Sequence, residues 1–300
     1  MRISVVYNPK SGRGKAQQLS DEIVRLGQMN GHTVRTSDIT GSQETTDEAL
    51  CDCDRLVIVG GDGTVHHMLP KLAQTQTPFY QCGTGTANLI AREFKMSNDP
   101  ARALEQLEVD CEPTRVDLPL CNGHPFLIMT SLGTDASVIH RFEETRRLGG
   151  YRSYIMPVLS EMFRPRFANV RVELDGEPCP RLSKPGVIVI ANMRQYGGHC
   201  DPCKRAVWND GLFDIAHITG GTSFTSGLRF LALRVRLPIA TSARAQRITL
   251  TAQSASCIQI DGEKPKEVCH TLGAGEQLEF TISEQGVRVH APLIAKNQAS

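Results

Sequence analysis

The chain has 300 residues, of which 40% are hydrophobic and 22% charged, and its formal net charge is +1. This length allows two domains, and the small net charge gives no global basic field that would favour nucleic acid as a partner. The first residues reach Asn8-Pro9 too soon for a signal peptide, and no apolar stretch approaches the roughly 18 residues of a membrane span. We therefore expect a cytoplasmic protein that is not integral to a membrane.

The N-terminal part of the chain alternates strand and helix patterns. Strands are expected at 3–7, 32–36, 56–59 and 79–80, and helices at 16–29, 45–50, 66–72, 87–94 and 100–107. This alternation predicts a mostly parallel sheet that is covered by helices on both faces. Ligands bind such sheets at the carboxyl ends of the strands.

After about residue 115 the pattern changes to short strand-like runs separated by Asp-Gly, Gly-Gly, Asn-Gly and Pro turn signals. Strands are expected at 115–118, 126–130, 168–174, 186–192, 212–218, 247–252, 258–260 and 278–282, and helices at 136–147 and 226–235. The fold class is therefore α/β plus all-β. We expect an α/β domain at 1–122, a β-rich sandwich or barrel domain at 123–290, and a tail at 291–300 that is frayed from Ile294 onward.

The ten cysteines are expected to be small buried hydrophobic side chains rather than a disulfide scaffold. Cys51-Asp52-Cys53 is too tight for an easy disulfide. His199-Cys200-Asp201-Pro202-Cys203 has zinc-knuckle spacing, but a partner pair at similar spacing is missing from the chain. Structural zinc is the weaker interpretation of this segment.

The most informative motif is Gly60-Gly61-Asp62-Gly63-Thr64, which directly follows a strand and precedes a helix. Glycines let backbone N–H groups approach phosphate oxygens, and a helix N-terminus carries partial positive charge. A carboxylate in such a turn suits a divalent cation held against the phosphates. The alternative is a tight turn in which Asp62 or Thr64 only caps the helix.

Two further turns have related composition. Asn8-Pro9-Lys10-Ser11-Gly12-Arg13-Gly14-Lys15 lies at the first strand–helix turn, but its glycine spacing and the following Ala16 exclude a Walker A loop. Gly83-Thr84-Gly85-Thr86-Ala87-Asn88 precedes another helix, which carries Arg92. Alone, the first turn is equally a flexible basic loop. The alternative for the second turn is a helix cap with a solvated arginine.

Four segments together resemble the diacylglycerol kinase catalytic-domain family, which includes soluble bacterial lipid kinases, sphingosine kinases and ceramide kinases. In chain order they are Asn8-Pro9-Lys10-Ser11-Gly12, Gly60-Gly61-Asp62-Gly63-Thr64, Gly85-Thr86-Ala87-Asn88 and Asp261-Gly262-Glu263. The resemblance implies an α/β nucleotide domain and a β-rich domain with the active site in the cleft between them. It also implies ATP, Mg²⁺ and transfer of the γ-phosphate to a lipid hydroxyl.

The resemblance also implies roles for individual residues. Asp261 is the expected general base, with Glu263 as a metal ligand or orienting carboxylate. The expected metal ligands are Asp62, Asp117 and Asp210. The residues expected to contact the nucleotide are Asn8, Ser11, Gly12, Arg13, Gly60, Gly61, Asp62, Gly63, Thr64, Gly85, Thr86, Asn88 and Arg92. Arg92 is also the expected partner of Asp117, although both fit equally well as surface charges or as a structural ion pair.

The chain contains a second Asp-Gly-Glu, at Asp175-Gly176-Glu177, which is expected to be a plain hairpin turn. Without the resemblance the two copies would be indistinguishable. Two positions depart from the family pattern. Leu89 replaces an aspartate after the loop asparagine, and Val207-Trp208 occupy the stretch where a second acidic ligand of a structural Mg²⁺ site is expected beside Asp210.

Residues 223–247 combine five arginines with apolar side chains and contain no acidic residue, and Arg146 and Arg147 add to this charge. Such a composition suits peripheral docking on anionic lipid headgroups. An ordinary half-buried helix with solvated arginines is the alternative. The sequence leaves open which lipid is bound and whether the protein forms a homodimer.

Three functions are therefore weighed. The first is an ATP-dependent lipid kinase acting on diacylglycerol or a similar lipid alcohol. The second is a kinase of a soluble substrate such as NAD, suggested only by the glycine motif that NAD kinases share. The third is a nucleotide- or lipid-binding regulator with little turnover. The joint presence of Asp62, Asp261 and Glu263 favours the first.

Overall fold

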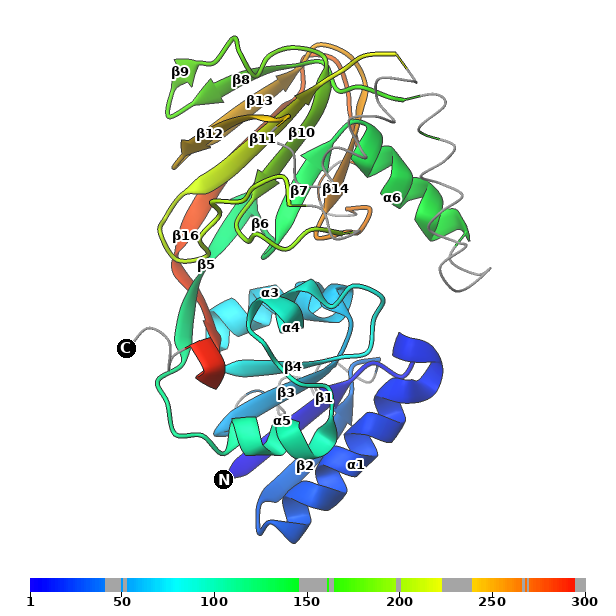
Figure 1. Cartoon of the computed structure of the whole chain (residues 1–300), viewed down its shortest axis with the longest axis vertical. Coiled ribbons are helices and arrows are strands. Elements are labelled where there is room, and N and C mark those ends of the chain that lie inside the picture. The colour runs from blue at the N-terminus through cyan, green and yellow to red at the C-terminus, as the bar shows by residue number, and fades with distance from the viewer. Residues whose placement is uncertain are drawn as a thin grey trace. The chain divides into compact units, whose positions relative to one another are not determined.

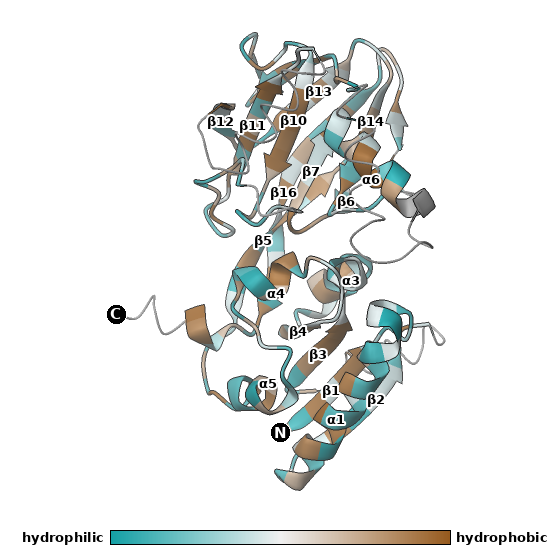
Figure 2. Cartoon of the chain, turned by 45° about the vertical axis from the view of Figure 1, so that its right-hand side comes forward, coloured by the Kyte–Doolittle hydropathy of each residue, from teal (hydrophilic) through white to brown (hydrophobic). Residues whose placement is uncertain are grey.

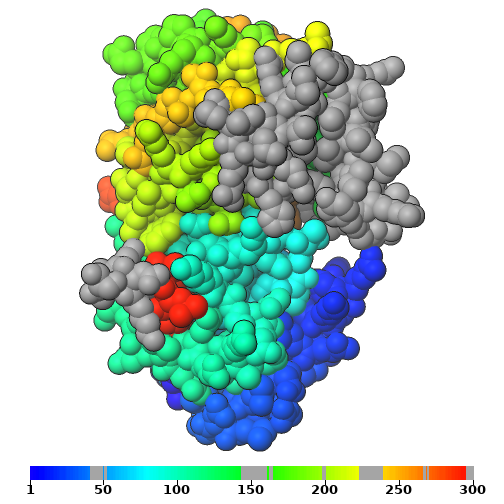
Figure 3. Space-filling view, viewed as in Figure 1, coloured from blue at the N-terminus to red at the C-terminus, as the bar shows by residue number. Residues whose placement is uncertain are grey.

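The chain divides into two compact units, of which the first is discontinuous in sequence. Met1–Leu118 and Glu284–Ser300 form unit 1, and Pro119–Ser283 forms unit 2. The computed structural model describes residues 1–40, 50, 53–145, 161, 165–197, 201–222, 239–265, 268 and 270–294. Figure 3 shows the C-terminal residues, in red, against the cyan and green surface of unit 1. There the backbone N–H of His290 donates to the carbonyl of Phe79 at 2.8 Å.

Unit 1 contains four parallel strands in the order β2-β1-β3-β4 (Figure 1). Their bounds are β1 (Arg2–Tyr7), β2 (Thr33–Asp38), β3 (Arg55–Gly60) and β4 (Phe79–Gly83). The helices are α1 (Lys15–Met29), α3 (Asp62–Thr75), α4 (Leu89–Glu93) and α5 (Pro100–Leu107), with a 3₁₀ turn at Ser11–Gly14. Gly60 lies opposite Gly83, so neighbouring strands end side by side.

One face of this sheet is covered by α1 and α5. Alternate residues of β1, β3 and β4 point to this side and pack against apolar positions of both helices; the cluster includes Ile3, Val5, Ile23, Val57, Val59, Tyr80, Leu104 and Leu107. Asp99 starts α5 by accepting the N–H of Arg102 at 3.0 Å, and Pro100 follows at the first helical position. Figure 2 shows the central strand β3 mostly hydrophobic and α1 with alternating hydrophobic and hydrophilic residues, as expected for a half-buried helix.

Unit 2 is built from antiparallel strands in two sheets. The six-stranded sheet has the order β12-β11-β10-β7-β14-β15, and the other runs β16-β13-β8-β9, with β5 and β6 paired beside β16. The strands that lie within unit 2 are β6 (His124–Pro125), β7 (Met129–Leu132), β8 (Val170–Leu174), β9 (Glu177–Pro178), β10 (Gly186–Ala191), β11 (Phe213–Thr219), β12 (Thr241–Ala245), β13 (Ile248–Ala252), β14 (Ser256–Ile260) and β15 (Thr271–Leu272). Strands β5 (Thr114–Cys121) and β16 (Gln277–Val289) lie partly in unit 1.

The core of unit 2 is formed by inward-facing residues of both sheets. Phe126, Phe213 and Phe280 contact one another at ring-centroid distances of 6.3–6.4 Å. Helix α6 (Thr134–Thr145) packs against β14. The predicted fold class, an α/β unit and a β-sandwich unit, is confirmed.

Several predicted bounds differ from the structure. Helix α3 begins at Asp62 rather than at residue 66, so the Asp62 carboxylate lies in its first turn. Strand β16 continues from unit 2 past Gly286 to Val289, where it pairs with Phe79 in unit 1. Strand β12 has no counterpart among the predicted strands. The helices expected at 45–50 and 226–235 fall outside the described residues except for Leu50, as do residues 295–300 of the expected tail.

Candidate active site

The three glycine-rich loops of unit 1 follow β1, β3 and β4, and they contact one another directly. The Thr84 hydroxyl donates to Ser11 Oγ at 2.8 Å, and the Thr84 N–H donates to the carbonyl of Gly60 at 3.2 Å. A Cβ built on Gly85 would lie 2.8 Å from the Cα of Gly61. The two backbones thus pass at a distance that only glycine permits, so the sequence brings peptide groups from separate loops together.

The first loop has an unusual backbone. Gly12, Arg13 and Gly14 all have positive φ, at 61°, 57° and 88°. Arg13 is exposed and adopts a conformation that is uncommon for a residue with a Cβ. A Cβ on Gly12 would lie 2.8 Å from the carbonyl oxygen of Thr84. Asn8 joins this loop to the second, because its amide donates to Thr64 Oγ1 at 3.2 Å.

Asp62 links the second loop to the third. Its carboxylate accepts the backbone N–H groups of Leu89 at 2.9 Å and Ile90 at 3.2 Å, the first residues of α4. Asp62 therefore caps a helix 27 residues away in the chain. Leu89, the position where the family pattern has an aspartate, contributes its backbone N–H to this contact and buries its side chain. The departure at Leu89 leaves the link between the loops intact.

The third loop is closed by Asn88. Its side-chain oxygen accepts the Gly85 N–H at 2.8 Å and its amide donates to the Gly85 carbonyl at 3.0 Å, while Asn88 itself has a φ of 48°. Thr86 in the same loop and Arg92 on α4 are exposed. Of the other expected residues, Gly63 lies in the first turn of α3 and Asp117 is buried in β5 with 6% exposure.

Gln81 supports the same loops, although it belongs to none of the sequence motifs. Its amide donates to the Gly60 carbonyl at 3.3 Å, and its oxygen accepts the N–H of Ala91 at 2.8 Å. The residue is fully buried in the strand Phe79-Tyr80-Gln81-Cys82-Gly83. An amide side chain within an apolar strand is the feature of the sequence that could have indicated this role, because a polar group buried in such a strand needs hydrogen-bond partners.

In unit 2, Asp261-Gly262-Glu263 forms a tight turn after β14. Ile260 and Glu263 exchange both backbone hydrogen bonds, at 2.9 and 3.0 Å, and Asp261 and Gly262 have φ values of 50° and 80°. The Asp261 side chain is buried and accepts three backbone N–H groups, from Leu127 and Ile128 at 2.8 Å and from Met129 at 3.0 Å. Glu263 is only half-buried.

The second Asp-Gly-Glu has almost the same backbone and different surroundings. Asp175 and Gly176 have φ values of 52° and 88°, and Leu174 pairs with Glu177 across the turn. Asp175 and Glu177 are both exposed, and Asp175 accepts the N–H groups of Gln246 and Arg247. The expectation of a plain hairpin turn is confirmed.

The similarity to known proteins covers most of the chain. Residues 2–120 match a family model described as diacylglycerol kinase catalytic domain, and residues 129–278 match one described as YegS C-terminal NAD kinase beta sandwich-like domain. A Pseudomonas fluorescens protein named "Probable lipid kinase YegS-like" is 30% identical over 269 residues, which are 84% of this chain and 82% of the relative. The chain belongs to the diacylglycerol kinase family.

Other members of the diacylglycerol kinase family extend the comparison. A Mycobacterium tuberculosis protein named "Diacylglycerol kinase" is 29% identical over 227 residues, which are 71% of this chain and 72% of the relative. A crystal structure of a diacylglycerol kinase from Bacillus anthracis has a TM-score of 0.68 at 15% identity and covers 98% of each chain. The family predicted from the four motifs is confirmed, and the structure shares the fold.

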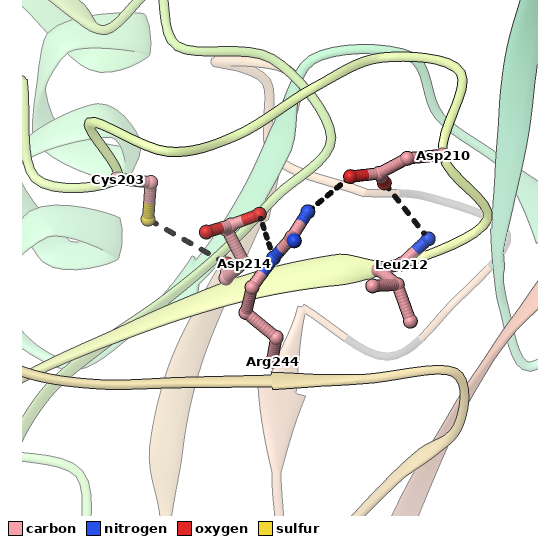
Figure 4. Close-up of polar contacts among 5 residues, drawn as sticks. All are labelled: Cys203, Asp210, Leu212, Asp214 and Arg244. Atoms are coloured by element: carbon pink, nitrogen blue, oxygen red, sulfur yellow. Dashed lines mark hydrogen bonds and ion pairs between the residues drawn. The ribbon is translucent and has the colours of Figure 1, made fainter.

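The structural Mg²⁺ site implied by the diacylglycerol kinase family does not fit the residues around Asp210. Arg244 on β12 forms ion pairs with Asp210 and, through Nε at 3.0 Å, with Asp214 (Figure 4). Asp210 also accepts the Leu212 N–H at 3.1 Å. Among the described residues, no group of three His, Cys, Asp or Glu side chains could hold a metal ion. The guanidinium supplies the positive charge that a cation would bring.

Burial raises the pKa of Asp214, and the charge of Arg244 opposes that rise. We expect Arg244→Gln to destabilise the protein by about 2 kcal/mol, because a largely buried carboxylate loses its countercharge at a partly exposed pair. The loss should shrink as the pH falls and Asp214 is protonated. Thermal unfolding at pH 5 and 7.5 measures this.

In the same assay, adding Asp214→Asn to Arg244→Gln should recover part of the lost stability, because it removes the uncompensated charge. For the unsubstituted protein without nucleotide, we expect the same melting temperature in EDTA and in millimolar Mg²⁺. A clear rise in Mg²⁺ that depends on Asp210 would contradict the assignment of Asp210 to an ion pair.

Only some of the cysteines and arginines singled out in the sequence lie among the described residues. Cys203 is buried with its thiol 3.5 Å from the Asp214 carbonyl, and burial raises its pKa (Figure 4). His199, Cys200 and Cys51 lie outside the described residues, as do Arg146, Arg147 and residues 223–238 of the basic segment. Within the described part of that segment, Arg244 is engaged by carboxylates, and Arg247 lies 3.7 Å from Glu279. No described helix is both long and apolar enough to span a membrane.

Proposed function

We propose that the protein is an ATP- and Mg²⁺-dependent lipid kinase that transfers the γ-phosphate to a hydroxyl of diacylglycerol or a similar lipid alcohol. Membership of the diacylglycerol kinase family supports the reaction class. The observation that carries the nucleotide part is the direct contact of three glycine-rich loops beyond adjacent parallel strands. This edge of a parallel sheet is where such folds bind ligands.

The loops suit a triphosphate because side chains are absent where the backbones converge. Gly12, Gly61 and Gly85 leave no Cβ at the points of closest approach, so phosphate oxygens can come close to the backbone of the loops without meeting a side chain. The hydroxyls of Ser11 and Thr86 and the exposed cations Arg13 and Arg92 add donors around the same loops. We assign the phosphates to this part of unit 1.

Asp62 is the carboxylate we assign to the metal of the nucleotide. Mg²⁺ in kinases is commonly held by one or two carboxylates together with substrate phosphates, so a dedicated cluster of acidic residues is not required. Asp62 lies in the second loop, and its two backbone hydrogen bonds to α4 fix the orientation of its carboxylate. The metal would neutralise negative charge on the phosphates during transfer.

For the proton of the attacking hydroxyl, we assign the general base to Glu263 rather than to Asp261, the residue that the resemblance implies. A general base must come within hydrogen-bond reach of the hydroxyl. The oxygens of Asp261 already accept three backbone N–H groups in a buried position, whereas Glu263 follows in the same turn and is half-buried. Asp261 then anchors the turn, and Glu263 accepts the proton.

The test is transfer of labelled phosphate from ATP and Mg²⁺ to a panel of lipids in mixed micelles, with NAD as the soluble control. Label on a glycerolipid or sphingoid alcohol supports the proposal and names the substrate class. Label on NAD alone would move the protein to the soluble-substrate alternative. ATP binding without transfer to any acceptor would favour a nucleotide-binding regulator.

A sedimentation assay with vesicles measures the proposed peripheral membrane contact separately. Binding should increase with the content of anionic lipid and decrease with salt, because the basic segment at 223–247 would contact headgroups electrostatically. Equal binding to neutral vesicles would remove the electrostatic part of this proposal.

A further inference from the structure

A buried glutamine connects the Asp261-Gly262-Glu263 turn to the interior of unit 2. Gln259 lies on β14 and is fully buried. Its side-chain oxygen accepts the backbone N–H of Gly262 at 2.7 Å, and its amide donates to Ser131 Oγ at 2.8 Å. The same amide is 3.4 Å from Asp135 Oδ2. One side chain therefore bridges the middle residue of the turn and two polar groups outside it.

The direction of every hydrogen bond in this network follows from its two ends. The Gly262 N–H can only donate, so the Gln259 oxygen must face it and the amide must face Ser131. The Ser131 hydroxyl then donates to the Asp135 carboxyl, which is the final acceptor. Tyr196 also hydrogen-bonds to Asp135, and burial raises the pKa of that carboxyl. Because each donor and acceptor in this series of hydrogen bonds is determined, the side chains of Gln259, Ser131 and Asp135 have a single arrangement.

Two sets of contacts therefore fix the turn from different sides. The Asp261 carboxylate is held by the N–H groups of β7 and the residues before it, and the Gly262 N–H is held by Gln259. Glu263 follows immediately, and its backbone is paired with Ile260. Asp261 and Gly262 both have left-handed φ values, and these contacts hold the turn in that conformation.

We infer that Gln259 is a positioning residue for the kinase reaction, which fixes the direction of Glu263 by holding the Gly262 N–H through the Ser131–Asp135 network. This inference rests on the proposed function, because Glu263 is the carboxylate assigned there to the proton. Gln259 itself is too deeply buried to contact a lipid or a nucleotide. Its effect on catalysis is therefore exerted entirely through the turn.

The first experiment compares Gln259→Met with Thr130→Val. Methionine keeps the volume of glutamine but provides no partner for Gly262 or Ser131. Thr130 is an equally buried neighbour on β7 whose hydroxyl donates to the Gln259 backbone carbonyl at 2.6 Å, so its loss removes a buried hydrogen bond without reaching the turn. We expect Gln259→Met to lower kcat by about 10- to 100-fold with little change in the KM for ATP, and Thr130→Val to change kcat by less than about 3-fold.

Amide hydrogen exchange gives a readout that does not depend on activity. In the protein without substrates, Gln259→Met should raise the exchange rate of the peptide covering 261–265, because the Gly262 N–H loses its acceptor. Thr130→Val should leave that peptide at its original rate. If the unsubstituted protein phosphorylates no lipid, the proposed function fails while this measurement still tests the network.

The second variant, Gln259→Glu, tests the direction of the hydrogen bonds through pH. A protonated glutamic acid can accept from Gly262 and donate to Ser131, as glutamine does, whereas the ionised form has no donor and repels Asp135. Among the described residues, helix α6 carries Asp135, His140, Arg141, Glu143 and Glu144, and β7 carries no ionisable group. The other ionisable groups around β14 are Cys257 on the strand itself, Asp261, Glu263 and Lys264 in and after the turn, Tyr196, and His270 before β15. Burial should raise the pKa of the new carboxyl above about 4.3.

The ratio of variant to unsubstituted kcat should therefore rise as the pH falls from about 8 to 5.5, whereas the ratio for Gln259→Met should stay flat. Three results would overturn the inference: a Gln259→Met protein with unchanged kcat and exchange, equal losses in Gln259→Met and Thr130→Val, or a Gln259→Glu ratio that does not respond to pH. If Gln259→Met fails to fold, Ser131→Ala replaces it, with the same expected direction in kcat and exchange.

Discussion

Asp62→Asn is expected to lower kcat for phosphate transfer by about 10²- to 10³-fold while leaving the protein folded. The amide keeps one oxygen that can accept an N–H of α4, so the contact between the second and third loops is weakened rather than lost. The amide has no charge with which to hold Mg²⁺ against the phosphates. Steady-state kinetics over a range of Mg²⁺ concentrations, together with a thermal melt, measures both consequences.

Asp99→Asn is the matched control for Asp62→Asn. Asp99 also caps a helix of unit 1, by accepting the N–H of Arg102, but it does not lie in any glycine-rich loop. Both substitutions should cost about 1 kcal/mol or less of stability, and only Asp62→Asn should change kcat. If the two variants lost activity equally, Asp62 would have no role beyond capping α4.

Glu263→Gln is expected to lower kcat by about 10²- to 10⁴-fold, because glutamine cannot accept a proton from the attacking hydroxyl, and to lower the melting temperature less than Asp261→Asn does. Asp261→Asn should behave differently. Its amide would face backbone N–H groups that need acceptors, so we expect a loss of about 3 kcal/mol of stability together with lower activity. Measuring both the melting temperature and kcat of the two variants distinguishes a general base at Glu263 from a residue that anchors the turn at Asp261.

The second Asp-Gly-Glu turn supplies the control for this pair. Glu177→Gln and Asp175→Asn make the same chemical changes in a turn with nearly the same φ values and exposed side chains. Neither should alter kcat, and Asp175→Asn should cost less than about 1 kcal/mol. If Glu263→Gln retained full kcat while Asp261→Asn lost activity without losing stability, the base would be Asp261 and our assignment to Glu263 would be wrong.

Local sequence was sufficient for the conformation of both Asp-Gly-Glu turns. Asp followed by Gly favours left-handed φ values at both positions, and the structure has them at Asp175-Gly176 and Asp261-Gly262 alike. The difference between the copies is non-local. Asp261 is buried because its strand lies beside β7, and it accepts the N–H of Met129 at the start of β7 and those of the two residues before it. Asp175 is exposed at the end of β8. Only the resemblance to the family could indicate this difference beforehand.

In the glycine loops, too, the local conformation follows from neighbouring residues, whereas the contacts depend on residues distant in the chain. Their position after strands, and their glycine content, follow from the residue order, since apolar runs followed by Gly predict strand-to-helix turns. Their mutual contacts do not, because parallel pairing of β1, β3 and β4 brings together residues such as Ser11 and Thr84 that lie 73 positions apart. The capping of α4 by Asp62 depends on the same pairing.

The sequence by itself determined the two fold classes, the family, the order of most strands and helices, and the local turns, because periodicity, glycine and motif spacing are properties of neighbouring residues. The tertiary structure alone decided the partners of buried polar groups: Gln81 and Gln259 beneath the loops they support, Arg244 between Asp210 and Asp214, and the N–H donors around Asp261. Such partners come from strands distant in the chain, and burial makes their hydrogen bonds obligatory without indicating in the sequence which groups will meet.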